Sequence, residues 1–317
     1  MQTRLPITVI IPTMNRPQSL SETLMSMTAV DELPAQIVVI DQTKDPILQT
    51  ENQKCAVFLS QYTEIEYRHL EVASITAARN EGMRLAKNDV VVFSDDDIEV
   101  YRETFHNVYD IMKSEEVAII GGHDNNIPLE HDTSIWSYIF GRVSYSKRKI
   151  GHVSPGVYGI FPSKLTEWTE TEWAMGFFFV VRKSLAMRWA LSFDENLLYY
   201  AYAEDLDFTY AYCRKGRVEG YKCGMSSLLS VNHKVSREYR VPKYSATMME
   251  ILHRYYILHK YDKALIARFL FWWCNIGIFL NRLIRKERPV DVLRAMRYLM
   301  ANRKDVERGK FRYELYM

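Results

Sequence analysis

The stretch Val90–Val100, VVVFSDDDIEV, joins an apolar run to three consecutive carboxylates. The run from Val90 to Phe93 has the composition of a strand buried on both faces of a sheet. Adjacent acids repel one another, and open α/β sheets bind their ligands at the carboxyl ends of such strands. We therefore expect a divalent cation here, Mn²⁺ or Mg²⁺, bound together with the phosphates of a substrate. The alternative is an acidic surface turn without a ligand.

Strands and helices alternate through residues 1–100. The predicted strands cover residues 7–11, 37–40, 65–69 and 90–93, and the predicted helices cover Leu20 to Met27 and residues 76–86. This alternation is typical of a parallel α/β sheet. Three of the strands end in the polar residues Thr13, Asp41 and Asp95, which would meet at one edge of the sheet, as in a nucleotide site. Neither GxGxxG after the first strand nor GxxxxGK[ST] is present, which argues against a dinucleotide cofactor and a P-loop.

The second half of the chain adds a further acidic pair. The predicted strands cover residues 117–120, 173–182 and 221–231, and two glycines close the first of them. The predicted helices cover residues 103–113 and 184–190. Residues 123–171 are interpreted as a loop region over the site. The segment Tyr199–Arg214 predicts an amphipathic helix with Glu204 and Asp205 in its first turn. The helix dipole favours acids there, so this pair is either catalytic or merely stabilising. His233 stands just past the last strand, where a lone histidine is usually structural.

Composition and charge limit the classes of protein. The chain has 317 residues, 48% hydrophobic and 25% charged, which fits a folded protein. Residues 1–242 hold 25 basic and 32 acidic side chains, net −7, whereas residues 243–317 hold 16 and 7, net +9. The four cysteines form no CxxC pair, so neither a zinc site nor a disulfide framework is indicated and a reducing cytoplasm is expected.

The basic C-terminal part is also aromatic and helical. Residues 264–284 are the most apolar stretch of the chain, and about twenty residues can span a bilayer. Arg268, Asn275 and Arg282 interrupt this stretch, so a helix lying in the membrane interface fits better. We expect contact with a membrane surface through residues 244–290; an ordinary core helix or the interface of a homodimer is the alternative. No motif supports nucleic-acid binding, and none is expected.

Six motifs in order resemble those of glycosyltransferase family 2, the inverting nucleotide-sugar glycosyltransferases with the GT-A fold. They are TVIIPTMNRPQSLSETLMSM, VVIDQT, AARNEGMRLAKNDVVVFSDDDIEV, GFFFVVRKS, FDENL and AEDLDFTYAYCRKG. The resemblance covers roughly residues 5–235. It implies a Rossmann-like mixed α/β sheet flanked by helices, with a C-terminal helical extension. The expected domains are 1–235, with a nucleotide half at 1–100 and an acceptor half at 101–235, and the extension at 236–317.

The resemblance also implies a role for each candidate site residue. The nucleotide-binding residues would be Pro12, Thr13, Asn15, Asp41, Arg79, Asp95 and Asp96. The metal ligands would be Asp97, Asp95 and His233, of which His233 has the weakest match to the family. Asp205 would be the general base that takes the proton of the acceptor hydroxyl, and Glu204 would assist it or contact the acceptor.

The implied reaction moves a sugar from a UDP-, GDP- or dTDP-sugar to a hydroxyl of a glycan or lipid-linked glycan. The expected setting is bacterial surface polysaccharide synthesis, in the cytoplasm at the inner face of the cell membrane. The residues after Asp41 depart from the family pattern, which leaves the nucleotide base open, and the absence of a QxxRW motif favours single addition. A metal-dependent phosphatase or nucleotidyltransferase is a second interpretation, although the motifs that each would carry on the first strand are missing. A membrane-associated scaffold with a degenerate site is a third.

Overall fold

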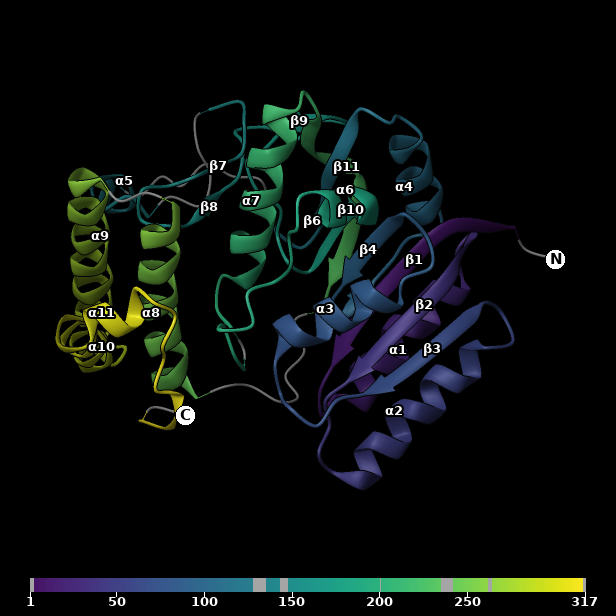
Figure 1. Cartoon of the computed structure of the whole chain (residues 1–317), viewed down its shortest axis with the longest axis horizontal. Coiled ribbons are helices and arrows are strands. Elements are labelled where there is room, and N and C mark those ends of the chain that lie inside the picture. Colours follow the sequence, from purple (N-terminus) through teal and green to yellow (C-terminus); the bar gives the residue numbers. More distant parts are fainter. Residues whose placement is uncertain are drawn as a thin grey trace.

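A nine-stranded mixed sheet forms the centre of the computed structural model, which describes residues 3–127, 135–142, 148–199, 201–234, 242–261 and 264–315 (Figure 1). Its strand order is β3-β2-β1-β4-β10-β6-β11-β5, and β9 pairs with β11. The strands are β1 (Arg4–Thr13), β2 (Leu33–Asp41), β3 (Glu64–His69), β4 (Val90–Ser94), β5 (Ile98–Glu99), β6 (Val117–Asp124), β9 (Thr169–Glu170), β10 (Phe178–Arg182) and β11 (Lys222–His233).

Strand direction brings the polar strand ends to one edge. β1 runs parallel to both β2 and β4, and Thr13 lies opposite Asp41 in the register of β1 and β2. β10 is antiparallel to β4, so it begins where β4 ends, with Phe178 opposite Ser94. The carboxyl ends of β1, β2 and β4 therefore share an edge with the first residues of β10, as open α/β sheets require for a ligand site.

Helices cover both faces of the sheet. α1 (Pro17–Thr28), α2 (Pro46–Leu59) and α4 (Thr104–Met112) pack on one face, and α3 (Ile75–Leu85), α6 (Lys183–Arg188) and α7 (Glu204–Val218) pack on the other. Successive side chains of a strand point to opposite faces. In β4, Val92 accordingly joins the first core, while Val91 and Phe93 join the second. This two-sided burial explains why the strand has no alternating polar residues.

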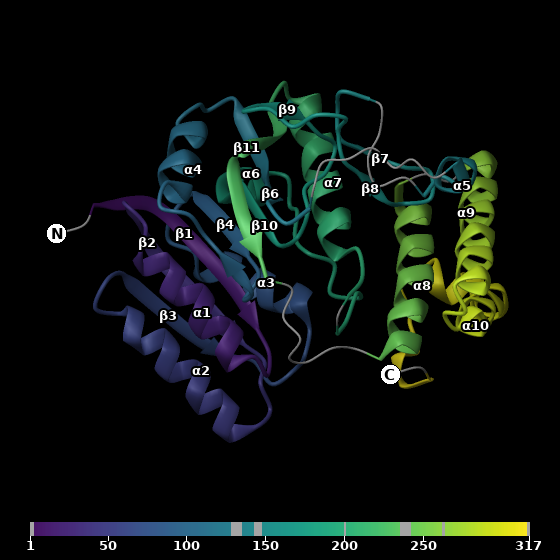
Figure 2. The ribbon, with the colours of Figure 1, turned by 180° about the vertical axis from the view of Figure 1, so that it is seen from behind.

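The C-terminal helices form a third core at one end of the molecule (Figures 1 and 2). They are α8 (Lys243–Tyr261), α9 (Leu265–Ile284), α10 (Pro289–Ala301), α11 (Arg303–Val306) and the 3₁₀ turn η1 (Tyr313–Leu315). Their core also includes Trp173 and Leu206, so the extension packs against the acceptor half. Within the described ranges, no helix combines the length and the hydropathy of a membrane span. The proposed boundary at 235/236 lies outside the described residues.

Several boundaries differ from the predicted ones; β1 and β2, for example, begin at Arg4 and Leu33 and not at residues 7 and 37. β6 continues through Gly121 and Gly122, because these glycines permit close packing and do not form a turn: a Cβ on Gly122 would lie 2.8 Å from the Leu229 carbonyl oxygen. β10 begins at Phe178 and not at residue 173, because the backbone before it bonds to α7. α6 ends at Arg188, and His233 is the last residue of β11.

Two described helices, α2 and α5 (Ile135–Ile139), were not predicted. α2 begins after Asp45, whose carboxylate accepts the backbone N–H groups of Ile47 and Leu48, and Pro46 occupies its first position. An aspartate before a proline is a helix-start signal, so the sequence did contain this information. The expected loop region at 123–171 holds α5 and a hairpin of β7 (His152–Val153) and β8 (Gly159–Ile160). Residues 128–134 and 143–147 of that region lie outside the described residues.

Candidate active site

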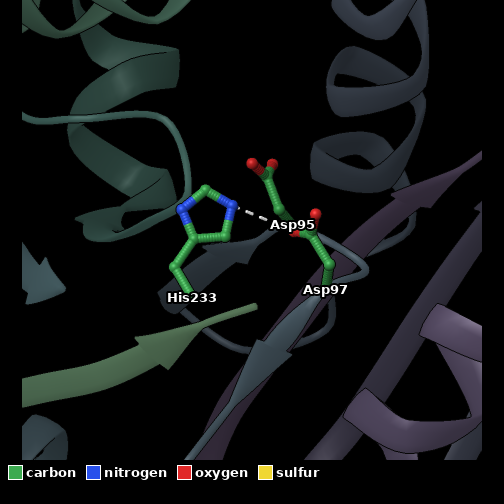
Figure 3. Close-up of side chains that lie close together, drawn as sticks. All are labelled: Asp95, Asp97 and His233. Carbon is green, nitrogen blue, oxygen red and sulfur yellow. Dashed lines mark ion pairs between the residues drawn. The ribbon is translucent and has the colours of Figure 1, made fainter. Parts of the chain in front are cut away.

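Asp95, Asp97 and His233 form a cluster that could hold a metal ion (Figure 3). One ligand atom from each residue lies within 4.8 Å of the others, and His233 Nε2 is 3.1 Å from an Asp97 carboxylate oxygen. Both aspartates follow β4, whereas the histidine ends β11, well over a hundred residues later. The structure therefore brings together the three residues for which the sequence predicted metal ligation.

Strand pairing holds His233 in this position. The short strand β5, which directly follows the aspartates, is antiparallel to β11 and places Ile98 opposite His233. The Lys234 backbone N–H donates to the Asp97 carbonyl oxygen at 2.9 Å, and the imidazole stacks on Phe177 with ring centroids 5.3 Å apart. Burial acts to lower the pKa of His233, but the hydrogen bond to Asp97 and the nearby carboxylates outweigh it and raise that pKa overall.

The donor set fits a transition metal of intermediate hardness. Mg²⁺ strongly prefers oxygen ligands, whereas two carboxylates and one imidazole also suit Mn²⁺. Burial raises the pKa of Asp95, opposed by Arg79 and reinforced by the neighbouring charge of Asp97. A cation between these groups would stabilise their charged forms, so the residues present fit a divalent metal.

The middle acid of the triplet has a different environment. Asp96 is buried, and its carboxylate accepts hydrogen bonds from Thr13 Oγ1 at 2.6 Å and from Arg16 at 3.0 Å. Burial raises the pKa of Asp96 to about 7, although Arg16 and Thr13 act to lower it. Thr23 Oγ1 also donates to the Asp96 carbonyl oxygen. Asp96 therefore ties the triplet to the end of β1 and to α1, so its predicted contact with the nucleotide would require these bonds to rearrange.

Arg16 is a site residue for which the sequence reasoning assigned no role. Its guanidinium lies 3.0 Å from Asp96 and 3.7 Å from an Asp97 oxygen, and its side chain is one quarter exposed. It directly precedes α1, after the turn that closes β1. The sequence did offer a signal for this role. Arg16 is a cation close to the end of the first strand, and the central strand of the same chain ends in three acids.

Asp41, the last residue of β2, is buried below the part of the site where the nucleotide was predicted to bind. It is fully buried, one of its oxygens accepts the Thr43 backbone N–H at 2.8 Å, and the other accepts Asn52 and Tyr67 Oη. Direct bonding to a base would compete with these donors. The Asn15 backbone N–H donates to Thr43 Oγ1 at 2.8 Å. The hydrogen bond thus joins the chain at the ends of β1 and β2. The predicted Pro12 and Thr13 are the last residues of β1, and Asn15 follows it.

Arg79 connects the metal cluster to α7. This fully buried guanidinium donates from Nη1 to Glu204 at 2.6 Å, and from Nη2 to Asp95 at 3.2 Å and to the Gly176 carbonyl oxygen at 3.0 Å. One planar group therefore touches an acid of the triplet and an acid of the Glu-Asp pair. Burial raises the pKa of Glu204 well above its usual value, although Arg79 opposes this and Asp205 adds to it. The two acidic motifs lie at the same edge of the sheet.

Asp205 is the more accessible member of the pair on α7. It is half-buried, whereas Glu204 is buried against Arg79. The two Asp205 carboxylate oxygens accept the backbone N–H groups of Gly176 at 2.7 Å and of Leu206 at 2.8 Å. These bonds fix the carboxylate but leave acceptor capacity on both oxygens. Asp205 can therefore receive a proton from a molecule that enters the site.

The loop before α7 is strained and is held by the C-terminal extension. Tyr199, Ala201 and Ala203 all have positive φ, which is costly without glycine and clusters at functional sites. Tyr313 Oη accepts the Leu198 backbone N–H at 3.0 Å, and it lies 2.9 Å from the Nε2 atom of the buried His253. The extension therefore positions the loop that leads to Glu204 and Asp205, a contact that no sequence motif indicated.

We expect Gly176→Ala to displace Asp205 and to lower turnover roughly 10- to 100-fold, since misplacing a reacting group by about 1 Å has that effect. A Cβ on Gly176 would lie 2.9 Å from the Asp205 Cβ and 3.0 Å from Oδ2. The measurement is release of nucleoside diphosphate from a sugar donor. Gly216→Ala, on the same helix as Asp205, is the matched control, because its Cβ would approach Cys223 Sγ at 3.2 Å and would meet Ala118 and Trp189 only at ordinary contact distances of 3.5 and 3.6 Å. Equal turnover in the two variants would show that the contact does not position Asp205.

The mixed sheet and its flanking helices have the fold of the GT-A glycosyltransferases. Residues 8–180, more than half of the chain, match the domain described as Glycosyl transferase family 2. The chain belongs to this family, as its motifs indicated, and glycosyl transfer is the activity that the family supports.

Solved structures share the fold at low sequence identity. Mannosyltransferase PcManGT from Pyrobaculum calidifontis, solved with GDP-Man and Mn²⁺, is 15% identical with a TM-score of 0.56 and aligns 97% of this chain with 83% of its own. GalNAc-T7, solved with UDP, GalNAc and Mn²⁺, is 14% identical with a TM-score of 0.57 and aligns 81% of this chain with 48% of its own. No curated protein sequence matches the chain.

Proposed function

We propose that this protein is a metal-dependent inverting glycosyltransferase. It would transfer a sugar from a UDP-, GDP- or dTDP-sugar to a hydroxyl of a glycan or lipid-linked glycan. The observation that carries this proposal is the Arg79 guanidinium, which bonds to Asp95 of the metal cluster and to Glu204, the neighbour of Asp205. A reaction of this kind needs a group that holds the diphosphate and a base for the acceptor within one site, and these contacts bring the two together.

Each group has a role in the proposed reaction. Asp95, Asp97 and His233 would hold Mn²⁺ or Mg²⁺, which when bound stabilises the negative charge that develops on the departing diphosphate. Arg16, beside Asp97, adds positive charge to the same region. Asp205 would remove the proton of the acceptor hydroxyl as that hydroxyl attacks the sugar carbon opposite the leaving group. Attack from that side inverts the configuration at the sugar carbon.

The nucleotide would lie over the ends of β1 and β2. Pro12, Thr13 and Asn15 line the end of β1, and Asp41 supports the adjoining loop from below through Thr43. Because the oxygens of Asp41 already accept internal donors, we propose that it shapes the base pocket more than it binds the base. The nucleotides in the two related structures, GDP-Man and UDP, support a nucleotide donor in general and leave its base open.

The setting that we propose is bacterial surface polysaccharide synthesis in the cytoplasm, at the inner face of the cell membrane. The catalytic part would span residues 1–235, and the extension at 236–317 would contact the membrane. The +9 net charge of residues 243–317 supports this, because the cytoplasmic leaflet carries anionic lipid.

A thermal-shift screen tests the proposed function. We expect UDP, GDP or dTDP to raise the melting temperature by on the order of 5 °C in the presence of Mn²⁺ and much less in its absence. A ligand at 100 times its Kd stabilises by about 2.7 kcal/mol, and each kcal/mol corresponds to roughly 2 °C in a chain of this size. If no nucleotide shifts the melting temperature with either metal, the protein does not use a nucleotide-sugar donor.

A further inference from the structure

The outer side of α9 is an exposed apolar stripe. The exposed apolar residues of this helix are Leu265, Ile266, Phe269, Trp273, Ile276, Leu280, Leu283 and Ile284, with exposed fractions between 36% and 81%. Six of them, from Ile266 to Leu283, recur at alternating spacings of three and four residues. That spacing places them along one face of a helix.

The opposite side of α9 is already used for folding. Ala267, Phe271, Cys274 and Ile278 are buried towards α8 and the core of the extension. In both ribbon views α9 lies at the end of the molecule farthest from α2 and β3, with α8 between it and the sheet (Figures 1 and 2). The core therefore explains one side of the helix and leaves the stripe facing outwards. Apolar surfaces of this extent usually mark an interaction site.

α5 extends the stripe into a broader surface. Trp273 donates its indole N–H to the Ile139 carbonyl oxygen at 2.8 Å, and its ring lies 5.1 Å from that of Phe140. α5 itself exposes Ile135, Trp136 and Ile139. We call the exposed apolar residues of α5 and α9 together the α5–α9 face. Tryptophan is enriched where an apolar surface meets lipid headgroups, and this face has two exposed tryptophans.

Positive charge borders the α5–α9 face. Neither helix contains an aspartate or a glutamate. The chain directly after α9 exposes Arg285, Lys286 and Arg288, of which Arg288 pairs with Asp291 at 2.7 Å. Glu287 is the one exposed acid between Ile284 and Met300 in this described segment. An apolar stripe with a cationic border is the pattern of a helix that lies on an anionic bilayer.

A second copy of this chain fits the same face less well. The three-four spacing is also that of a coiled coil, in which charged residues beside the seam set partner and orientation. Within α9 the residues beside the seam carry no charge; they are Leu265, Leu270, Trp272, Gly277, Phe279 and Ile284. The cationic border would also repel its own copy. An anionic lipid surface meets neither difficulty.

We propose that the α5–α9 face inserts into the headgroup region of an anionic lipid bilayer, with α9 lying parallel to the membrane plane. This inference deepens the proposed function and rests on it for the lipid-linked acceptor. It also changes which residues are expected to contact the membrane: α8 is removed from the predicted range 244–290, because it is buried along most of its length, and α5 is added. The contact would consist of α5, α9 and the residues that lead into α10.

Vesicle binding tests the proposal on the full chain. We expect co-sedimentation with phosphatidylcholine vesicles that contain 30% phosphatidylglycerol, and at least tenfold weaker binding to pure phosphatidylcholine. Phe269→Glu with Ile276→Glu should lower binding to the anionic vesicles at least tenfold. The matched control is Ile47→Glu with Val57→Glu on α2, at the other end of the molecule, where the residues are 71% and 57% exposed. Arg285→Gln with Lys286→Gln should remove most of the preference for anionic lipid.

Three results would overturn the proposal. They are no binding to either vesicle, equal losses in the α9 and α2 variants, and a dimer in sedimentation equilibrium that the α9 variant dissociates. The nucleotide and Mn²⁺ melting shift separates this proposal from the proposed function. If the α9 variant keeps that melting shift but binds vesicles like the wild type, only the proposal that the α5–α9 face docks on a membrane is wrong. If the wild type shows no melting shift, the proposed function is wrong, and the vesicle measurements alone then decide the membrane proposal.

Discussion

Replacing Asp97 with alanine should abolish the Mn²⁺-dependent melting shift and lower sugar transfer by at least about 100-fold. Losing even an outer-shell partner of a metal commonly costs about 10- to 100-fold, and Asp97 would be a direct ligand. It is buried, and it is hydrogen bonded to His233 within the cluster. Its loss leaves Asp95 and His233, of which only Asp95 would then offer a carboxylate to the metal.

The Asp97→Ala variant should still fold, which keeps this result interpretable. Arg16 retains Asp96 as its partner, and the Lys234 backbone bond goes to the Asp97 carbonyl oxygen and survives the change. A melting curve without ligand checks this. Glu115→Ala, which removes an exposed acid outside the site, is the control and should keep the full shift. An undiminished nucleotide shift with Mn²⁺ in Asp97→Ala would mean that this residue holds no metal.

The sequence allows prediction of those features of the candidate site that depend on residues close together in the chain. The apolar run from Val90 ends in acids, and the parallel strands around it bring Thr13 and Asp41 to the same edge. These features follow from strand pattern and topology, which local sequence encodes. The family motifs supplied the order of the elements and the pairing of the triplet with the acids on α7.

The contact partners of each acid depend on packing between residues far apart in the chain. These partners could not be predicted from the sequence. Three consecutive aspartates look alike in a sequence, but Thr13 and Arg16 engage the second one. Glu204 and Asp205 also look equivalent, and it is Arg79 that pairs with the first. The hydrogen bond between Tyr313 and the loop before α7 joins residues more than a hundred positions apart. No periodicity signals a contact of that kind.

Replacing Asp205 with asparagine should lower turnover by about 10²- to 10⁴-fold and leave nucleotide binding unchanged. A general base contributes a factor of that size, because a hydroxyl attacks poorly while it keeps its proton. The amide oxygen of asparagine can still accept the Gly176 backbone N–H, and only the bond from the Leu206 backbone N–H is given up, so the anchor of the side chain to Gly176 should persist. The rate of nucleoside diphosphate release from the donor found in the melting screen, with water or a glycan as acceptor, is the measurement.

Two further variants, one in α7 and one at the residue that directly follows it, make this test specific to the base. Glu219→Gln removes an exposed acid at the other end of the helix, where a surface ion pair contributes little, and should leave turnover unchanged. Glu204→Gln weakens a buried partner of Arg79 and should lower the melting temperature, which Asp205→Asn should not do. The two acids would thus differ in kind: Glu204 would order the site, and Asp205 would remove the proton of the acceptor. Wild-type turnover in Asp205→Asn would exclude it as the base, because no carboxylate would remain at that position to take the proton.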